Sequence, residues 1–244
     1  MSEKTLEKKL PKPSAQKLRY NNLINLETVS DSQRKAVEAF DSNSELVLIG
    51  SAGTGKTFLA MHLALDLVME PASRYDKVII LRSVVPVRDI GFLPGDRYEK
   101  EEVYTQPYQA LSRELFPGID DPWKKLVSQK TVEFVTTSYI RGITFRDCIL
   151  IVDEMQNMCW SELNTVMTRI GENCRVIFCG DFFQSDFDRE KDRNGLKNFM
   201  KIIDEIEDFA VVVFTWNDIV RSDIVKRYIM AKEKLKNTGN IDIS

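Results

Sequence analysis

The residues that most constrain this chain are those from Gly50 to Thr57, which read Gly-Ser-Ala-Gly-Thr-Gly-Lys-Thr. They fit the P-loop pattern Gly-x4-Gly-Lys-Ser/Thr in full, and they lie between an apolar run at residues 46–49 and a helical pattern at residues 57–68. Glycines let backbone N–H groups curl around phosphate oxygens, and the positive end of the following helix dipole faces the same anion. The motif therefore predicts a strand–loop–helix unit that binds the phosphates of a nucleoside triphosphate such as ATP.

Two side chains of this loop have predicted roles of their own. Lys56 is expected to reach the β- and γ-phosphates, and the Thr57 hydroxyl is expected to ligate Mg²⁺. The complete predicted nucleotide-binding segment is Gly50, Ser51, Ala52, Gly53, Thr54, Gly55, Lys56, Thr57 and Phe58.

Short apolar runs recur along the rest of the chain, with helical patterns between them. Continuous apolar runs of this length are typical of strands that are buried on both faces, and their alternation with helices predicts βαβ units. We therefore expect an α/β fold: one P-loop NTPase domain with a mostly parallel sheet and helices on both faces. The runs are residues 46–49, 78–81, 132–136, 148–152, 176–179 and 210–214, and helical patterns cover 57–68, 160–170 and 196–206.

The chain has 244 residues, enough for one large domain with a core. Residues 1–20 hold six basic residues against two acidic ones and predict a flexible basic arm, either a solvated tail or a phosphate contact. The domain itself is expected over residues 21–235, from a first helix capped by Ser30 or Asp31 to a last amphipathic helix at 221–235, with a flexible tail at 236–244. Prolines and glycines between residues 84 and 123 predict an ordered excursion with one short helix near residues 108–115.

Composition narrows the functional classes. The net charge is −3, so the whole chain does not attract nucleic acid by charge alone. No apolar run approaches the roughly 18 residues that a membrane span needs, and the N-terminus has no apolar stretch, so we expect a cytoplasmic protein. The single histidine, His62, leaves no histidine general base to spare, and the four cysteines show no Cys-x-x-Cys pair and are expected to be buried thiols.

A pair of carboxylates follows one of the predicted strands. Residues 148–152 are apolar and lead directly into Asp153 and Glu154. Ligands of open α/β sheets bind at the carboxyl ends of the strands, so Asp153 is positioned to hold Mg²⁺ and Glu154 to orient the attacking water. This second carboxylate favours hydrolysis over phosphoryl transfer to a metabolite. The alternative is an acidic pair that starts a helix after the strand.

Two glutamines complete the candidate site. Gln184 lies just past the Gly180-Asp181 turn that ends another predicted strand, where an amide could sense the γ-phosphate; the alternative is a simple turn. Gln33, in the first helix, could read the adenine edge with its amide. Its spacing fits a solvent-facing helix residue equally well.

Together these residues resemble the PhoH family, whose ATPase core is similar to that of superfamily 1 RNA and DNA helicases. Residues 91–96, Gly-Phe-Leu-Pro-Gly-Asp, look like that family's own Gly-Phe-Leu-Pro-Gly element, and residues 139–142 look like its Tyr-Met-Arg-Gly segment. Residues 153–157 resemble its Asp-Glu-Ala-Gln-Asn, with Met155 in place of alanine, and residues 195–196 and 218–221 resemble its last two blocks. The chain departs from the family at Ser83, at residues 182–185 and after Arg221.

The resemblance implies a RecA-like core with ATPase activity on RNA or single-stranded DNA. A single core cannot clamp ATP from both sides, so a ring-like homo-oligomer is expected, with a hexamer as one candidate. Arg221 stands where the family has its terminal arginine and would act across the subunit interface; the alternative is a surface salt bridge to Asp218 or Asp223.

Two other functions stay open: a P-loop kinase, which would need an acceptor pocket, and a nucleotide-dependent switch or scaffold with slow turnover. The excursion offers side chains for stacking on bases, but Glu99, Glu101 and Glu102 would repel phosphate, so a subunit-contact loop fits it equally. The candidate nucleic-acid residues are Arg88, Arg97, Tyr98, Tyr104 and Tyr108.

Overall fold

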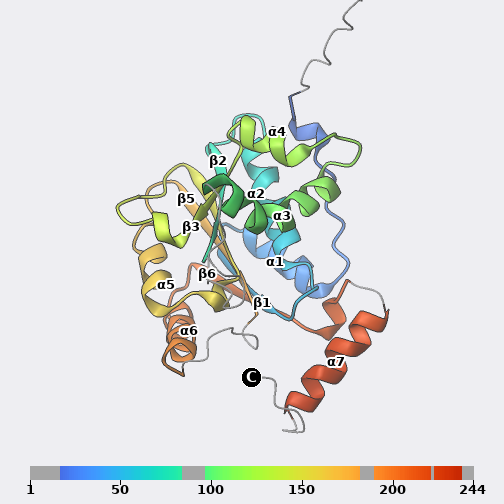
Figure 1. The fold of residues 1–244 in the computed structure, drawn as a ribbon, viewed down its shortest axis with the longest axis vertical. Coiled ribbons are helices and arrows are strands. Elements are labelled where there is room, and N and C mark those ends of the chain that lie inside the picture. The colour runs from blue at the N-terminus through green and yellow to red at the C-terminus, as the bar shows by residue number, and fades with distance from the viewer. Residues whose placement is uncertain (1–16, 84–96, 182–189, 221–222, 238–244) are drawn as a thin grey trace, which may run out of the picture.

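A six-stranded parallel sheet forms the centre of the computed structural model, which describes residues 17–83, 97–181, 190–220 and 223–237 (Figure 1). The strand order is β3-β2-β4-β5-β1-β6, and every pairing between neighbouring strands is parallel. All six residues of β4 are buried, as expected for an apolar run in the middle of a sheet. The predicted α/β fold with a parallel sheet is confirmed. The strands are β1 (Glu45–Gly50), β2 (Lys77–Arg82), β3 (Val132–Thr136), β4 (Cys148–Asp153), β5 (Cys174–Gly180) and β6 (Phe209–Phe214).

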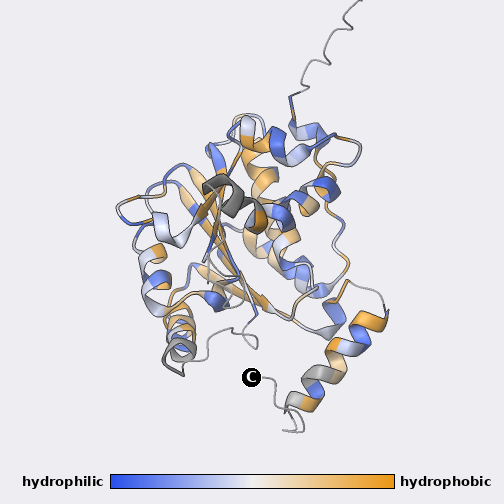
Figure 2. Ribbon diagram, viewed as in Figure 1, coloured by the Kyte–Doolittle hydropathy of each residue, from blue (hydrophilic) through white to orange (hydrophobic). Residues whose placement is uncertain are grey.

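Helices cover both faces of this sheet, as the alternating pattern predicted. Successive side chains of a strand point to opposite faces of the sheet, so the core consists of two apolar clusters, one between each face and the helices that cover it. Figure 2 accordingly shows apolar residues along the strands at the centre of the fold. One face carries α1 (Asp31–Asp41), α2 (Lys56–Met69), α3 (Arg97–Leu115) and α4 (Pro122–Ser128), and the other carries α5 (Trp160–Met167) and α6 (Glu190–Ile203).

The first helix begins at the cap predicted from the sequence. Ser30 is the N-cap of α1, and its hydroxyl accepts a hydrogen bond from the Gln33 N–H at 3.3 Å. Within the predicted basic arm, residues 17–20 are described, and Leu18 among them is buried in the core. The last helix, α7 (Asp223–Asn237), stands away from the sheet at the lower right of Figure 1.

The prediction of one short helix in the excursion was wrong. The structure has a 19-residue helix, α3, followed by α4. Pro107, which indicates a helix boundary in the sequence, lies inside α3. Pro122 occupies the first turn of α4, where a missing N–H costs nothing. Two of the other predicted helices differ at their ends: the pattern at 160–170 forms α5 (Trp160–Met167), and the pattern at 196–206 forms α6 (Glu190–Ile203).

The sheet brings the chemistry of the chain to one edge. Because all strands run in the same direction, the carboxyl ends of β1, β4 and β5 meet there, with β5 between the other two. These ends carry Gly50 of the P-loop, Asp153 and Gly180. In the described part of the chain, no helix is long and apolar enough to cross a membrane.

Candidate nucleotide-binding site

The P-loop joins β1 to α2, as predicted, and two of its glycines are required by the backbone. Gly55 is the N-cap of α2 and has a φ of 83°, in the left-handed region where a side chain is strained. Gly50 passes β6 closely, because a Cβ there would lie 2.5 Å from the Phe214 carbonyl oxygen. The turn therefore leaves the start of α2 facing the sheet edge, where its N–H groups can bind an anion.

Lys56 folds back over this loop. Its Nζ donates to the carbonyl oxygens of Gly50 at 2.6 Å and Ser51 at 2.8 Å, and to Thr54 Oγ1 at 3.2 Å. Burial lowers the pKa of Lys56, although the acidic groups near it act in the opposite direction. The ammonium group is thus held at the mouth of the loop by neutral oxygens that phosphate oxygens can replace.

Thr57 connects the P-loop to β4. Its hydroxyl donates to Asp153 Oδ1 at 2.9 Å, which brings together the two residues predicted to hold Mg²⁺. Asp153 is buried, and burial together with the neighbouring Glu154 raises the pKa of its carboxyl group. A hydroxyl and a carboxylate are the hard oxygen donors that Mg²⁺ prefers, and the ion commonly takes only one or two carboxylates with phosphate oxygens and water. The residues therefore fit this metal.

Asp153 has a second partner that sequence reasoning missed. Tyr108, from α3, is fully buried and donates its hydroxyl to Asp153 Oδ2 at 2.7 Å. Tyr108 was predicted to offer its ring to nucleic-acid bases; because it is buried against this carboxylate, that prediction was wrong. Arg82 is the register partner of Asp153 on β2. Burial lowers the pKa of Arg82, but the nearby Tyr108, Glu154 and Asp153 raise it by more.

Glu154 is held in an unusual backbone conformation. It has a φ of 54°, which is uncommon for a residue with a side chain. Its carboxylate accepts a hydrogen bond from the Gln156 side-chain amide, whose oxygen accepts the Asp181 N–H at 2.9 Å. Gln156 thus joins the ends of β4 and β5, a role that no local pattern in the sequence identified.

Gln33 faces the P-loop rather than solvent. It is buried, and its Oε1 accepts the Val29 N–H at 2.8 Å. Its amide nitrogen lies 3.5 Å from where a Cβ on Gly55 would be. A cavity of about 250 Å³ opens beside it, and this space is lined mainly by apolar side chains around the start of α2: Leu26, Val29, Phe58, Leu59, Leu111 and Val220, with Glu27, Gln33, Gly53, Gly55 and Glu114. A cavity next to a phosphate loop, with one amide on its wall, can take a planar base.

The family model for the PhoH-like protein matches residues 25–233, which is most of the chain. The chain belongs to the PhoH-like protein family. It is 32% identical over 209 residues to a PhoH-like protein of Synechocystis, covering 85% of this chain and 62% of the relative. It is also 32% identical over 204 residues to the protein PhoH of Escherichia coli, covering 83% of this chain and 56% of the relative. The chain thus spans about three fifths of the length of these curated relatives.

Among solved structures, the PhoH-like chain is similar to a large terminase from a thermophilic bacteriophage, with a TM-score of 0.47, 14% identity, and coverage of 84% of this chain and 50% of that one. It is also similar to the Pif1 helicase of Candida albicans, with a TM-score of 0.42, 19% identity, and coverage of 86% and 44%. At these scores the likenesses say nothing about function. The assignment to P-loop NTPases follows from the loop, the strand order and the family.

Several predicted residues of the PhoH-like chain lie outside the described residues. These are Gln184, Arg221, Arg88 and the family element at residues 91–96. Arg97 and Tyr98 lie in α3, whose first side chains are not described, and Tyr104 is half-buried. The residue before Arg221 is placed: the Val220 N–H donates to the Gly53 carbonyl at 3.1 Å, so this part of the chain reaches the P-loop.

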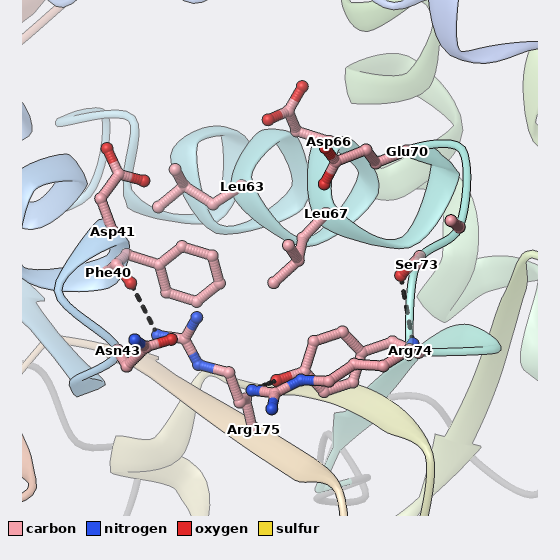
Figure 3. Close-up of a pocket in the computed structure, with 12 residues that line it drawn as sticks. Phe40, Asp41, Asn43, Leu63, Asp66, Leu67, Glu70, Ser73, Arg74 and Arg175 are labelled. Atoms are coloured by element: carbon pink, nitrogen blue, oxygen red, sulfur yellow. Dashed lines mark hydrogen bonds between the residues drawn. The ribbon is translucent and has the colours of Figure 1, made fainter.

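A larger cavity, of about 460 Å³, lies away from the P-loop of this PhoH-like chain, near the amino-terminal ends of β2 and β5 (Figure 3). Its floor is Arg175, a buried residue at the start of β5 that donates to the carbonyl oxygens of Phe40 at 2.9 Å and Ser44 at 2.7 Å. The guanidinium carbon also lies 3.7 Å from the centre of the Phe40 ring. These contacts tie the end of α1 to β5, so Arg175 has a structural role that its contacts explain.

Proposed function

We propose that this chain binds ATP with Mg²⁺ and hydrolyses it, as an oligomeric, helicase-like ATPase that acts on RNA or single-stranded DNA. The observation that carries the ATPase part is the 2.9 Å contact between Thr57 and Asp153. It joins the phosphate loop to the end of β4, where Glu154 follows at once. Membership of the PhoH-like family supports the same interpretation.

Each residue of the site would have a separate task. Lys56 and the N–H groups of the loop bind the phosphates, and Gln33 binds the adenine edge in the cavity beside α2. Thr57 and Asp153 hold Mg²⁺, which when bound neutralises charge on the phosphate oxygens. Glu154 orients the water, and Gln184, just past β5, senses the γ-phosphate. A kinase would need the acceptor group of its substrate to bind where, in this proposal, Glu154 orients the attacking water.

Exposed aromatic side chains support a nucleic-acid partner. Tyr139 and Trp160 are 50% and 40% exposed and follow β3 and a loop after β4 respectively. The Thr137 hydroxyl donates to Glu162 Oε1 at 2.5 Å, which links the segments that carry the two rings. Arg141 is exposed in the same loop as Tyr139. Exposed rings and a cation on linked segments suit the bases and phosphates of a single strand.

A ring-like homo-oligomer, with a hexamer as one candidate, is the proposed assembly. α7 exposes apolar side chains, with Ile224 at 73% and Tyr228 at 67%, and edge strand β6 exposes Val213 at 55%. Exposed apolar groups of this kind suit a protein interface. In such a ring, Arg221 would stabilise the transition-state charge of the neighbouring subunit's site, an effect typically worth about 10³-fold or more in rate.

The first experiment compares the wild type with Lys56→Ala, in nucleotide titration and in ATP turnover with and without single-stranded RNA and DNA. We expect the variant to fold and to lose nucleotide binding, because the ammonium group of Lys56 donates its hydrogen bonds, among the described residues, to its own loop and not to the core. Turnover of the wild type should rise with a single strand. Near-normal affinity in folded Lys56→Ala would refute the site, and slow turnover indifferent to nucleic acid would favour a switch or scaffold.

The role of Arg221 is tested by mixing. Neither Arg221→Ala nor Lys56→Ala should hydrolyse ATP alone, but mixed and allowed to exchange subunits they should regain part of the activity. Some interfaces would then pair an intact P-loop with an intact arginine. A native mass measurement gives the oligomer number, and a fully active monomer would exclude the role across the interface.

A further inference from the structure

Tyr108 is placed so that its hydroxyl can act on the candidate metal site. It lies in α3, and its hydroxyl meets Asp153 Oδ2 at 2.7 Å. The other carboxylate oxygen, Oδ1, accepts the Thr57 hydroxyl at 2.9 Å. Both oxygens of this buried carboxylate therefore have an O–H donor, and two donors on opposite oxygens fix the rotation of the carboxylate plane.

The tyrosine is itself held firmly. Its ring stacks on Trp123, with centroids 6.1 Å apart and planes at 24°, and packs against Phe134 at 5.8 Å. Tyr108 is fully buried, and Arg82, the register partner of Asp153, contacts its hydroxyl. A ring fixed by aromatic neighbours places its hydroxyl reproducibly, which a solvent-exposed donor would not do.

We propose that Tyr108 is the positioning residue of the metal site: it fixes the Asp153 carboxylate in the orientation that binds Mg²⁺ beside Thr57. The inference rests on the proposed function, because it assumes that Asp153 holds the metal. It assigns Tyr108 no contact with nucleotide. Groups that orient a metal ligand typically change metal affinity by about 10- to 100-fold when they are removed.

The test is Tyr108→Phe, which keeps the ring and its stacking and removes only the hydroxyl. We expect ADP affinity in the presence of a metal chelator to equal that of the wild type, because the P-loop is unchanged. The Mg²⁺ concentration that half-saturates the ADP complex should rise about tenfold, at the lower end of this range, since Thr57 still holds Oδ1. Equal half-saturation in the wild type and the variant would overturn the proposal.

Tyr75→Phe is the matched control. Tyr75 is also buried, and its hydroxyl accepts a hydrogen bond from Arg74 at 2.6 Å, at the other edge of the sheet. Loss of this hydroxyl should leave both affinities unchanged. A tenfold effect in both variants would mean that losing any buried tyrosine hydroxyl loosens the domain, and this would also overturn the proposal.

A second measurement keeps the hydroxyl and does not depend on how the phenylalanine variant folds. 3-Fluorotyrosine at position 108 places a ¹⁹F nucleus beside the oxygen that contacts Asp153. Its resonance should shift when Mg²⁺ is added to the ADP complex, and a fluorotyrosine at position 75 should not respond. A resonance at position 108 that does not shift when Mg²⁺ is added would overturn the proposal. Failure of the wild type to bind ADP more tightly with Mg²⁺ would instead refute the metal site, and with it this inference.

Discussion

Arg175 allows a stability effect to be separated from a functional one. The perturbation is Arg175→Met, which keeps an unbranched apolar stem in the floor of the larger cavity (Figure 3). The guanidinium makes two hydrogen bonds to backbone oxygens and stacks on Phe40. In the variant, the Phe40 oxygen still accepts a hydrogen bond from the Asn43 N–H, at 3.0 Å. The Ser44 oxygen loses the hydrogen bond from Arg175, so most of the expected destabilisation arises there.

The magnitude follows from these contacts. Hydrogen bonds from a charged donor contribute about 1.5–3 kcal/mol each, and a desolvated cation over a ring adds up to about 2 kcal/mol. Burial opposes this gain, as the lowered pKa of Arg175 indicates, because the guanidinium is removed from water. We expect a net loss of about 2–3 kcal/mol in the free energy of unfolding, or about 5–10 °C in melting temperature for a domain of this size.

The assay is urea unfolding of Arg175→Met and Arg74→Met, together with ADP titration of both folded variants. Arg74 lines the same cavity but is exposed and donates one hydrogen bond to the Tyr75 hydroxyl, so its loss should cost about 0.5–1.5 kcal/mol, less than the loss of Arg175. Both variants should bind ADP as the wild type does, because the P-loop lies at the other edge of the sheet. Unchanged stability of Arg175→Met, or weakened ADP binding in a fully stable protein, would refute the structural role of this arginine.

Three further outcomes are expected. Glu154→Gln should bind MgATP and hydrolyse it at least about 10²-fold more slowly, because it lacks the carboxylate that we propose orients water, and unchanged single-turnover kinetics would assign that role to another residue. Gly50→Ala should lose about 1–3 kcal/mol in urea unfolding, because its Cβ would meet the Phe214 oxygen at 2.5 Å, and wild-type stability would contradict that clash. Binding of a single strand should be weak and should fall between low and physiological salt in a fluorescence titration, since the net charge is −3; salt-independent affinity would be inconsistent with phosphate contacts.

The phosphate loop and the carboxylates could be predicted from the sequence because both are local. A run of apolar residues that ends in Asp153 places that side chain at the strand edge, and parallel strands bring all such edges together. Whether the Gln33 side chain faces the site or solvent could not be predicted in this way. Its orientation depends on how α1 packs on the sheet, and helical spacing alone fits the buried and the exposed positions equally.

Tyr108 shows where prediction from the sequence failed. Its neighbour Pro107 indicated a helix boundary, yet α3 continues through it. Its partner, Asp153, lies 45 residues away in the sequence, and no sequence pattern within α3 predicts that contact. A tyrosine in a proline-rich segment therefore suggested a surface ring, while tertiary packing against Trp123 and Phe134 had buried it.

α3 touches the site in two places, and this has a thermodynamic consequence. Leu111 and Glu114 line the cavity beside the P-loop, while Tyr108, one turn earlier, holds Asp153. If a base in the cavity shifts this helix, it changes the affinity for metal, and the metal must change the affinity for the base by the same factor. A base that fits poorly would then weaken the hold on Mg²⁺, so the domain would distinguish nucleotides by how fast they react as well as by how tightly they bind.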